Sequence, residues 1–258
     1  MTIWALSDPH LCFGLPSKTM EVFGPNWARY TDKIQEHWIE KVAPQDLVLI
    51  PGDISWAMHL QEALPDLLWL DALPGKKVIL RGNHDHWWGS LAKLLAALPP
   101  SLQAIQNNAF SWTTAKGQKV AIGGSRLWDT PEYTFGPFIE FRENPLARRK
   151  SAEEIKEEQE NAEKIFVREL ERLRLSLSQL DPSASVRIAL THYPPLGADL
   201  KPSRASAILE EFKIDICVFG HLHNVRREAL AFGKARGVHY IFASCDYVDF
   251  APVPVWVK

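Results

Sequence analysis

The feature that most constrains the fold is a set of short apolar runs that recur along the whole chain. They show little alternation of apolar and polar residues, which is typical of strands buried on both faces. The runs cover residues 3–6, 47–50, 78–80, 120–124, 186–190, 216–219, 239–243 and 253–257. We therefore predict a β-sheet protein whose strands are covered on both sides.

Helical patterns lie between the early runs. Apolar residues recur at helical spacing over 26–42, 59–73 and 90–98, and Pro74 and Pro99 follow the second and third patterns. This alternation predicts βαβ units and a largely parallel sheet in the first hundred residues. The runs come closer together after residue 100, which predicts a second, more antiparallel sheet. The stripe that we expect to be buried in the first helix consists of Trp27, Tyr30, Ile34, Trp38 and Ile39.

The clearest helix is predicted over residues 151–180. Ser151 can form a capping box with Glu154, and acidic residues in the first half give way to basic residues in the second. An irregular aromatic stretch, 130–150, precedes it. We interpret the chain as a single domain, 1–258, with a loop-plus-helix insertion at about 130–180. This insertion could cap the active site, or the helix could cover a sheet face, which its single apolar stripe favours.

Composition limits the partners. The formal net charge is −2, so the chain lacks the basic surface of a dedicated nucleic-acid binder, and a nucleic-acid partner is not expected. The three cysteines include no C-x-x-C pair, and Cys217 is expected to be a buried thiol. No apolar run is long enough to cross a bilayer, and the N-terminus does not resemble a signal peptide. We expect a cytoplasmic protein with no membrane partner, and the oligomeric state stays open.

Metal-binding residue types follow five of the apolar runs. In a parallel sheet the carboxyl ends of the strands share one edge, where ligand sites form. Taken singly, each residue could be a turn residue, a helix cap or a hydrogen-bonded core histidine. Because such residues recur at five strand ends, a shared metal-binding site is favoured over five separate structural roles. The residues are Asp8, His10, Asp53, Asn83, His192, His221 and His223.

These seven residues offer oxygen and nitrogen ligands but no thiolate, which suits divalent Mn, Fe, Zn or Co. Seven ligands are too many for one tetrahedral zinc ion. They suit two ions about 3.5–4 Å apart that share one carboxylate, as in two-metal hydrolases.

The pattern D-x-H … GD … GNHD … H … GHxH, from Asp8 to His223, closely resembles the calcineurin-like metallophosphoesterases. The resemblance implies an α/β fold, a four-layer αββα sandwich of two mixed β-sheets flanked by helices. It also implies a dinuclear centre in which Asp53 bridges the two metals. The first metal would be held by Asp8, His10 and His223, and the second by Asn83, His192 and His221.

The implied reaction is hydrolysis of a phosphoester by a metal-bridging hydroxide that attacks phosphorus in line. His84, beside Asn83 but not a ligand in the family pattern, would be the general acid. The alternative for His84 is a turn histidine bonded to the backbone. Asp85 is expected to orient the loop.

Departures from the family pattern bear on the substrate. Trp56 stands where protein Ser/Thr phosphatases carry an Asp, and the stretch 191–195 is similar to that of small-molecule phosphodiesterases. Lipid A precursor hydrolases have Arg where this chain has His84. The resemblance therefore argues against both of these activities.

Arg126, His86 and Trp87 are predicted to contact the substrate. Arg126 could instead form a surface salt bridge, and Trp87 and Trp88 could pack at the start of a helix. We predict a hydrolase that acts on a small-molecule phosphodiester or nucleotide. The alternatives are a phosphomonoesterase, a nuclease of the same superfamily, or a non-catalytic metal-binding scaffold.

Overall fold

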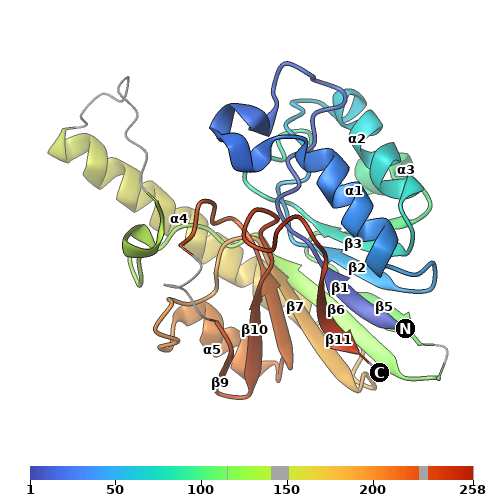
Figure 1. Cartoon of the computed structure of the whole chain (residues 1–258). Helices are drawn as coiled ribbons and strands as arrows, with labels where there is room; N and C mark the ends of the chain where they lie inside the picture. Colours follow the sequence, from blue (N-terminus) through green and yellow to red (C-terminus); the bar gives the residue numbers. More distant parts are fainter. Residues whose placement is uncertain (115, 141–150, 227–231, 258) are drawn as a thin grey trace.

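A computed structural model describes residues 1–114, 116–140, 151–226 and 232–257. Two β-sheets form its centre (Figure 1). The first has the strand order β11-β1-β2-β3-β4, and the second has the order β5-β6-β7-β8-β10-β9. The strands of the first sheet are β1 (Thr2–Ala5), β2 (Leu47–Ile50), β3 (Lys76–Leu80), β4 (Leu102–Ile105) and β11 (Val253–Val257). Those of the second are β5 (Phe110–Thr113), β6 (Lys119–Ser125), β7 (Val186–Thr191), β8 (Ile216–Phe219), β9 (Lys234–Ala235) and β10 (Val238–Phe242).

The two sheets pack face to face, and helices cover their outer faces. Alternate residues of β2 show why: Leu47 and Leu49 belong to the apolar cluster between the sheets, whereas Val48 and Ile50 face the helices. The four-layer αββα sandwich, an α/β fold, is thus confirmed. The helices over the first sheet are α1 (Tyr30–Lys41), α2 (Leu60–Ala72) and α3 (Leu91–Ala97), and those over the second are α4 (Ala152–Leu177) and α5 (Arg204–Glu211). Three short 3-10 helices are η1 (Met20–Phe23), η2 (Pro25–Trp27) and η3 (Gly136–Phe138).

The first sheet has the predicted parallel core. The second sheet is more antiparallel than the first only at its edges, with two antiparallel strand pairs of five against one of four. Strands β6, β7, β8 and β10 are parallel, and only the edge strands β5 and β9 run antiparallel to their neighbours. The reason is that α4 connects β6 to β7 and α5 connects β7 to β8, as parallel strands require a crossover. Helix α5 has only eight residues, so its periodicity was too short to predict a helix.

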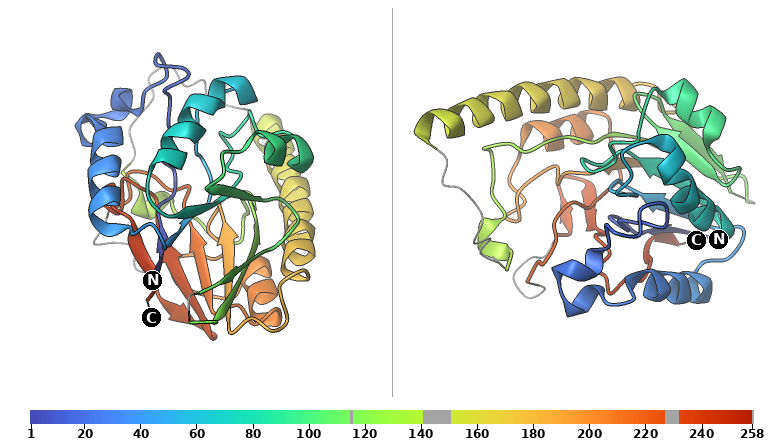
Figure 2. Two further views of the ribbon diagram at one scale, coloured as in Figure 1. Left: turned by 90° about the vertical axis from the view of Figure 1, so that its right-hand side faces the viewer. Right: turned by 90° about the horizontal axis from the view of Figure 1, so that it is seen from above.

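Helix α4 begins with the predicted capping box of Ser151 and Glu154. Its second half packs on β6, where the Ser176 hydroxyl accepts a hydrogen bond of 2.8 Å from the Gly124 amide. Its first half extends past the sheets (Figures 1 and 2), and Ile155 is 44% exposed there. The helix therefore covers a sheet face with one half only. The division into a single domain with an insertion stays a prediction, and residues 141–150 of that insertion lie outside the described ranges.

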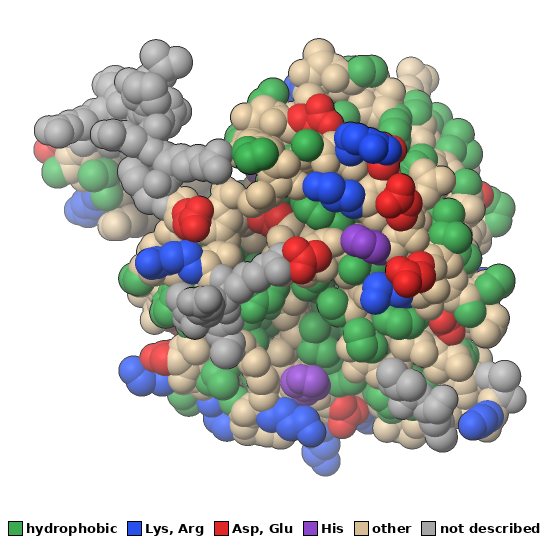
Figure 3. All heavy atoms as spheres, viewed as in Figure 1, with side chains coloured by type: hydrophobic (Ala, Val, Ile, Leu, Met, Phe, Trp, Pro, Cys, Tyr) green, Lys and Arg blue, Asp and Glu red, His purple; other side chains and the backbone are tan. Residues whose placement is uncertain are grey.

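The exposure of single side chains and the distribution of surface charge can also be compared with the predictions. Ile39 is 58% exposed, so its place in the buried stripe of α1 was wrong, whereas Cys217 is buried as expected. On the face shown in Figure 3, acidic and basic side chains are interspersed and form no continuous basic surface. Among the described residues, no helix is long and apolar enough to cross a membrane.

Candidate metal centre

The seven predicted site residues come together at the carboxyl ends of strands from both sheets. Asp8 and His10 follow β1, Asp53 follows β2, and Asn83 follows β3 in the first sheet. In the second sheet His192 follows β7 directly, and His221 and His223 follow β8. Because the sheets pack face to face, the site residues of the first sheet lie next to those of the second.

The first donor group consists of Asp8, His10 and His223, whose ligand atoms lie within 4.8 Å of one another. The Nε2 atoms of the two histidines are 3.1 Å apart. The fully buried Asp8 carboxylate accepts bonds from the His221 amide at 3.0 Å and from the Ser244 hydroxyl at 2.8 Å. These bonds fix the carboxylate without using all of its lone pairs, so it can still bind a cation.

The second donor group consists of Asp53, His192 and His221. Asn83 belongs with it, because its Oδ1 lies 2.7 Å from His192 Nε2 and 3.0 Å from His221 Nδ1. The other ring nitrogen of His192 lies 3.1 Å from the Pro51 carbonyl oxygen. That contact requires a proton on Nδ1, so Nε2 is the ring nitrogen available to a cation. Burial alone would lower the pKa of His192, but Asp53 and Asp8 raise it, so a cation at Nε2 would displace a proton.

Asp53 lies between the two groups. Its Oδ2 is 3.6 Å from His10 Nε2 and 3.4 Å from His192 Nε2. Its Oδ1 accepts a hydrogen bond of 2.8 Å from the His84 amide. Burial would raise the pKa of Asp53, but the neighbouring His192, His10 and His84 hold that pKa well below its usual value. Asp53 is therefore an ionised carboxylate within reach of both groups.

The chemistry of the donors fits divalent cations. Burial lowers the pKa of His10 and of His221 well below the usual value, so both imidazoles are neutral and can act as ligands. Among the described residues, the buried His10 Nδ1 has no hydrogen-bond partner. Lone pairs that converge in a buried site, beside two carboxylates, are stabilised by a cation.

Glycines of the motifs are required by close approach of the backbone. A Cβ atom on Gly82 would lie 2.0 Å from Asp53 Oδ1, and one on Gly220 would lie 2.1 Å from Asp8 Oδ2. Both positions therefore exclude every other residue type, because a side chain would displace a carboxylate of the site.

A model of the calcineurin-like phosphoesterase family matches residues 1–225, which is most of the chain. The chain belongs to this family. Its two groups of Asp and His side chains are candidate metal sites, which is consistent with a metal-dependent phosphoesterase.

Individual relatives are more distant. Over 83 residues the phosphoesterase is 34% identical to the Gene 66 protein of Mycobacterium phage D29, a match that covers 32% of this chain and 40% of that protein. The chain thus matches less than half the length of this relative. Phosphopantetheinyl hydrolase (PptH) of Mycobacterium tuberculosis has a similar structure, with a TM-score of 0.55, 16% identity and coverage of 100% and 96% of the two chains. A protein of unknown function from Aquifex aeolicus has a TM-score of 0.46 at 15% identity, with coverage of 98% and 95%.

Asp85 of the phosphoesterase ties the loops of the site together. Its fully buried carboxylate accepts hydrogen bonds from the amides of Ile54, Ser55 and Gly82 and from the Trp87 indole, at 2.7–3.1 Å. Burial raises the pKa of Asp85 to about 6, even though these donors favour the charged form. Asp85 thus joins the loop after β2 to the loop after β3, as the sequence suggested.

His84 lies beside the first donor group without belonging to either. Its ring centroid is 5.6 Å from that of His10 and 4.5 Å from that of Trp56. Burial lowers the pKa of His84, and the charge of Asp53 partly offsets this. Trp56, the residue that departs from the protein phosphatase pattern, stacks on His10 at 4.8 Å. Trp56 therefore supports His10 by an aromatic face.

The three residues predicted to contact the substrate differ in how exposed they are and in what they bind. Trp87 is only 3% exposed and packs in the core under the first sheet, so its assignment to substrate is wrong. Its indole is used by Asp85, and Trp88 is likewise buried and donates to Gln106. His86 is exposed. Arg126 is 13% exposed, stacks on Trp128 at 4.4 Å and lies 3.6 Å from Glu169, which is more than a surface salt bridge.

Sequence reasoning missed several residues that support the candidate ligands. Asp246 accepts a 2.9 Å hydrogen bond from His223 Nδ1, and Ser244 bonds Asp8. Tyr30 donates to the backbone oxygen of His10 at 2.7 Å. Ser244 and Asp246 follow β10, a sixth strand end whose polar residues we had not included. A search of every strand end for carboxylates would have found Asp246.

Proposed function

We propose that this phosphoesterase hydrolyses a small-molecule phosphodiester or nucleotide at a centre of two divalent metal ions, Mn, Fe, Zn or Co. The observation that carries the proposal is the position of Asp53 between two separate donor groups. Asp8, His10 and His223 would hold one ion, Asn83, His192 and His221 the other, and Asp53 both. When bound, such a pair lowers the pKa of a water molecule and neutralises charge on the phosphoryl oxygens.

Two residues outside the donor groups have roles of their own: Asp85 positions a loop of the site, and His84 supplies a proton to the leaving group. Asp85 fixes the loop that carries Asn83 and His84, so the imidazole of His84 stays at the edge of the centre. We assign to His84 the transfer of a proton to the leaving oxygen, because it is a half-buried imidazole that lies outside both donor groups.

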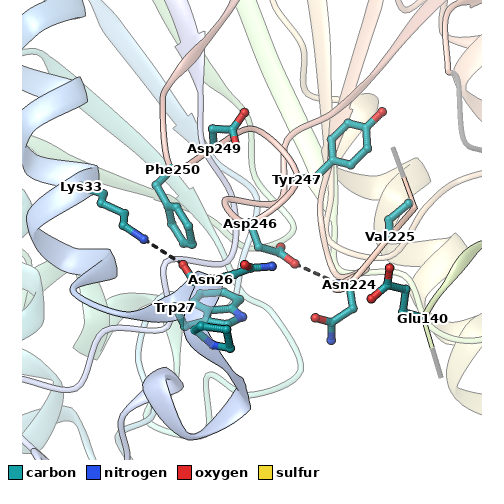
Figure 4. Close-up of a pocket in the computed structure, with 11 residues that line it drawn as sticks. Asn26, Trp27, Lys33, Glu140, Asn224, Val225, Asp246, Tyr247, Asp249 and Phe250 are labelled. Carbon is teal, nitrogen blue, oxygen red and sulfur yellow. Dashed lines mark hydrogen bonds between the residues drawn. The ribbon is translucent and has the colours of Figure 1, made fainter. Parts of the chain in front are cut away.

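Two cavities on either side of the centre favour a diester. One, of about 500 Å³, lies beside His223 and is lined by Trp27, Asn224 and Asp246, among others (Figure 4). The other, of about 350 Å³, includes His221 and Tyr193 in its wall. A phosphodiester carries a substituent on each of two ester oxygens, so it can occupy both cavities, whereas a monoester has only one substituent. Both volumes are in the range of small-molecule sites.

Other substrates receive less support. The formal net charge of −2 and the interspersed charges on the face shown in Figure 3 do not favour the basic surface that a nuclease uses to hold its substrate. The structural relative named phosphopantetheinyl hydrolase makes a phosphopantetheinyl ester a sensible compound to test. The cytoplasmic location stays a prediction.

The test is Mn²⁺-dependent hydrolysis of bis-p-nitrophenyl phosphate, compared with p-nitrophenyl phosphate as the monoester. Asp53→Asn should abolish diester turnover and reduce bound metal, whereas Asp199→Asn, which changes an exposed carboxylate paired with Lys201, should leave both unchanged. Turnover of the monoester alone would contradict the diester proposal and favour a phosphomonoesterase. If Asp53→Asn keeps the turnover of the unchanged protein, as Asp199→Asn should, the assignment of Asp53 to the metal centre is contradicted.

A further inference from the structure

A small cavity lined by arginines lies next to the candidate metal centre. The carboxyl ends of β3, β4 and β6 and the second half of α4 enclose a volume of about 70 Å³. This is room for a few water molecules or one tetrahedral anion. The charged residues in its wall are Arg81, Arg126, Arg172 and Glu169, and we call this cavity the arginine notch.

Among the described residues that line the notch, Glu169 is the one acidic residue, and it is already fully engaged. Glu169 is 2% exposed, and its Oε1 lies 2.7 Å from Arg172, 3.6 Å from Arg126 and 3.9 Å from Arg168. Its other oxygen accepts a hydrogen bond of 3.0 Å from the Ser125 hydroxyl. One carboxylate cannot balance three guanidinium groups, so the notch keeps an excess of positive charge.

The arginines have hydrogen-bond donors to spare. A guanidinium group carries five N–H donors. Arg81 uses one of them, at Nε, on the Asp85 carbonyl oxygen at 3.2 Å. Arg126 is mostly buried, yet no acceptor among the described residues takes a hydrogen bond from its guanidinium group. Partly desolvated donors of this kind favour an anionic ligand, and Arg binds phosphate in the bidentate manner that suits this geometry.

The notch adjoins the second donor group. Arg81 lies two residues before Asn83 in the same loop. The Arg126 carbonyl oxygen accepts hydrogen bonds from the His192 amide at 3.2 Å and from the Tyr193 amide at 2.9 Å. In contrast, the described residues that line the pocket in Figure 4 include three acidic residues, Glu140, Asp246 and Asp249, and one basic residue, Lys33. A negative group of the substrate is therefore attracted to the notch and away from that pocket.

We propose that the arginine notch binds a second phosphate group of the substrate, one that is not hydrolysed. This inference rests on the proposed function and narrows the substrate class to phosphodiesters or nucleotides that carry an additional phosphate. Arg126 and Arg172 then act as specificity residues, and Glu169 holds their guanidinium groups in place.

The experiment compares two esters that differ by one phosphate. They are thymidine 5′-(p-nitrophenyl phosphate) and the same compound with a 3′-phosphate. We expect the 3′-phosphate to raise kcat/KM by about tenfold or more, mainly through KM, as charge-assisted hydrogen bonds would. Arg172→Gln should remove most of this preference. Arg168→Gln is the matched control, since Arg168 also contacts Glu169 from α4 but does not line the notch, and it should keep the preference.

Equal kcat/KM for the two esters, or a preference that Arg172→Gln leaves intact, would overturn the inference. Hydrolysis of neither ester would count against the proposed function, and the notch is then tested by calorimetry. Thymidine 3′,5′-bisphosphate should bind the metal-loaded protein more tightly than thymidine 5′-monophosphate, and Arg172→Gln should abolish the difference. Equal affinities in that measurement would reject the notch itself.

Discussion

The hydrogen bond between His223 and Asp246 leads to a prediction that pH can test. We consider Asp246→Asn, which keeps the shape of the side chain but removes its charge. Burial alone would lower the pKa of His223, yet Asp246 and Asp8 raise it to about 9. The partner of Nδ1 thus makes the imidazole more basic, and a more basic imidazole is a better metal ligand.

Two effects of the substitution oppose each other. Loss of a carboxylate behind a histidine ligand weakens metal binding by 10–100-fold, or about 1.4–2.7 kcal/mol. At pH 7, however, a pKa of about 9 means that a metal ion must displace a proton from His223, which weakens binding to the unchanged protein by roughly 100-fold. The substitution lowers this pKa and removes most of that competition. We therefore expect the affinities of the two proteins to be similar at pH 7 and to differ by 10–100-fold at pH 9.

The assay is Zn²⁺ binding in competition with a chromophoric chelator, measured from pH 7 to pH 9. Asp249→Asn is the control, because Asp249 lines the same pocket and the His223 ring is bonded to Asp246 (Figure 4). A loss of affinity that is the same at every pH would refute the proton competition. Unchanged affinity at pH 9 would refute the role of Asp246 in orienting the ligand.

Three further predictions concern other residues. Asp85→Asn leaves an amide group facing the Gly82 amide, so we expect the free energy of unfolding in urea to fall by about 2–4 kcal/mol and turnover to fall with it. Burial lowers the pKa of Lys77 to about 8, so this lysine destabilises the fold by about 3 kcal/mol below pH 8, where it is charged in both states. Because the charged form is the one penalised, the free energy of unfolding should rise by about 3 kcal/mol between pH 8 and 10.5 relative to that of Lys77→Met, measured by urea denaturation; an equal pH dependence in the two proteins would contradict the shift. His84→Ala should lower kcat by about 10²–10⁴-fold while metal content, measured by elemental analysis, stays unchanged, and lost metal would contradict its assignment as the acid.

The sequence predicted the buried strands and the clustering of site residues because both follow from one local pattern, whereas the packing of the two sheets was implied by the resemblance to the family. A buried parallel strand is a continuous apolar run, and its carboxyl end is fixed once the run is found. Asp53 and His192 could therefore be located at the two ends that meet, although they are far apart in the sequence and lie beside different sheets. The motif order supplied the pairing of the sheets, which apolar runs alone do not contain.

Features that depend on contacts between distant segments could not be predicted in this way. Trp87 follows a motif histidine, yet its indole is buried because Asp85 accepts its N–H, a bond that no local pattern indicates. The parallel order of the second sheet depends on α5, which is too short to show a clear period. Asp246 stands at a strand end, but its contact with His223 depends on β10 lying beside β8, which no local pattern indicates.

Backbone conformation at the ligands explains why residue types alone do not define this site. Asp8, His10, Asp53 and His221 all have positive φ, between 43° and 74°, a region that costs non-glycine residues about 1–3 kcal/mol each. Backbone bonds between the loops hold this conformation: the Asp8 amide donates to the Gly52 oxygen at 3.1 Å, and the His10 amide donates to the Asp53 oxygen at 3.0 Å. The loops after β1 and β2 thus stabilise each other, and neither could keep its ligands in place alone. The backbone bonds that connect the loops therefore support the centre together with the donors, although the motif gives no sign of these bonds.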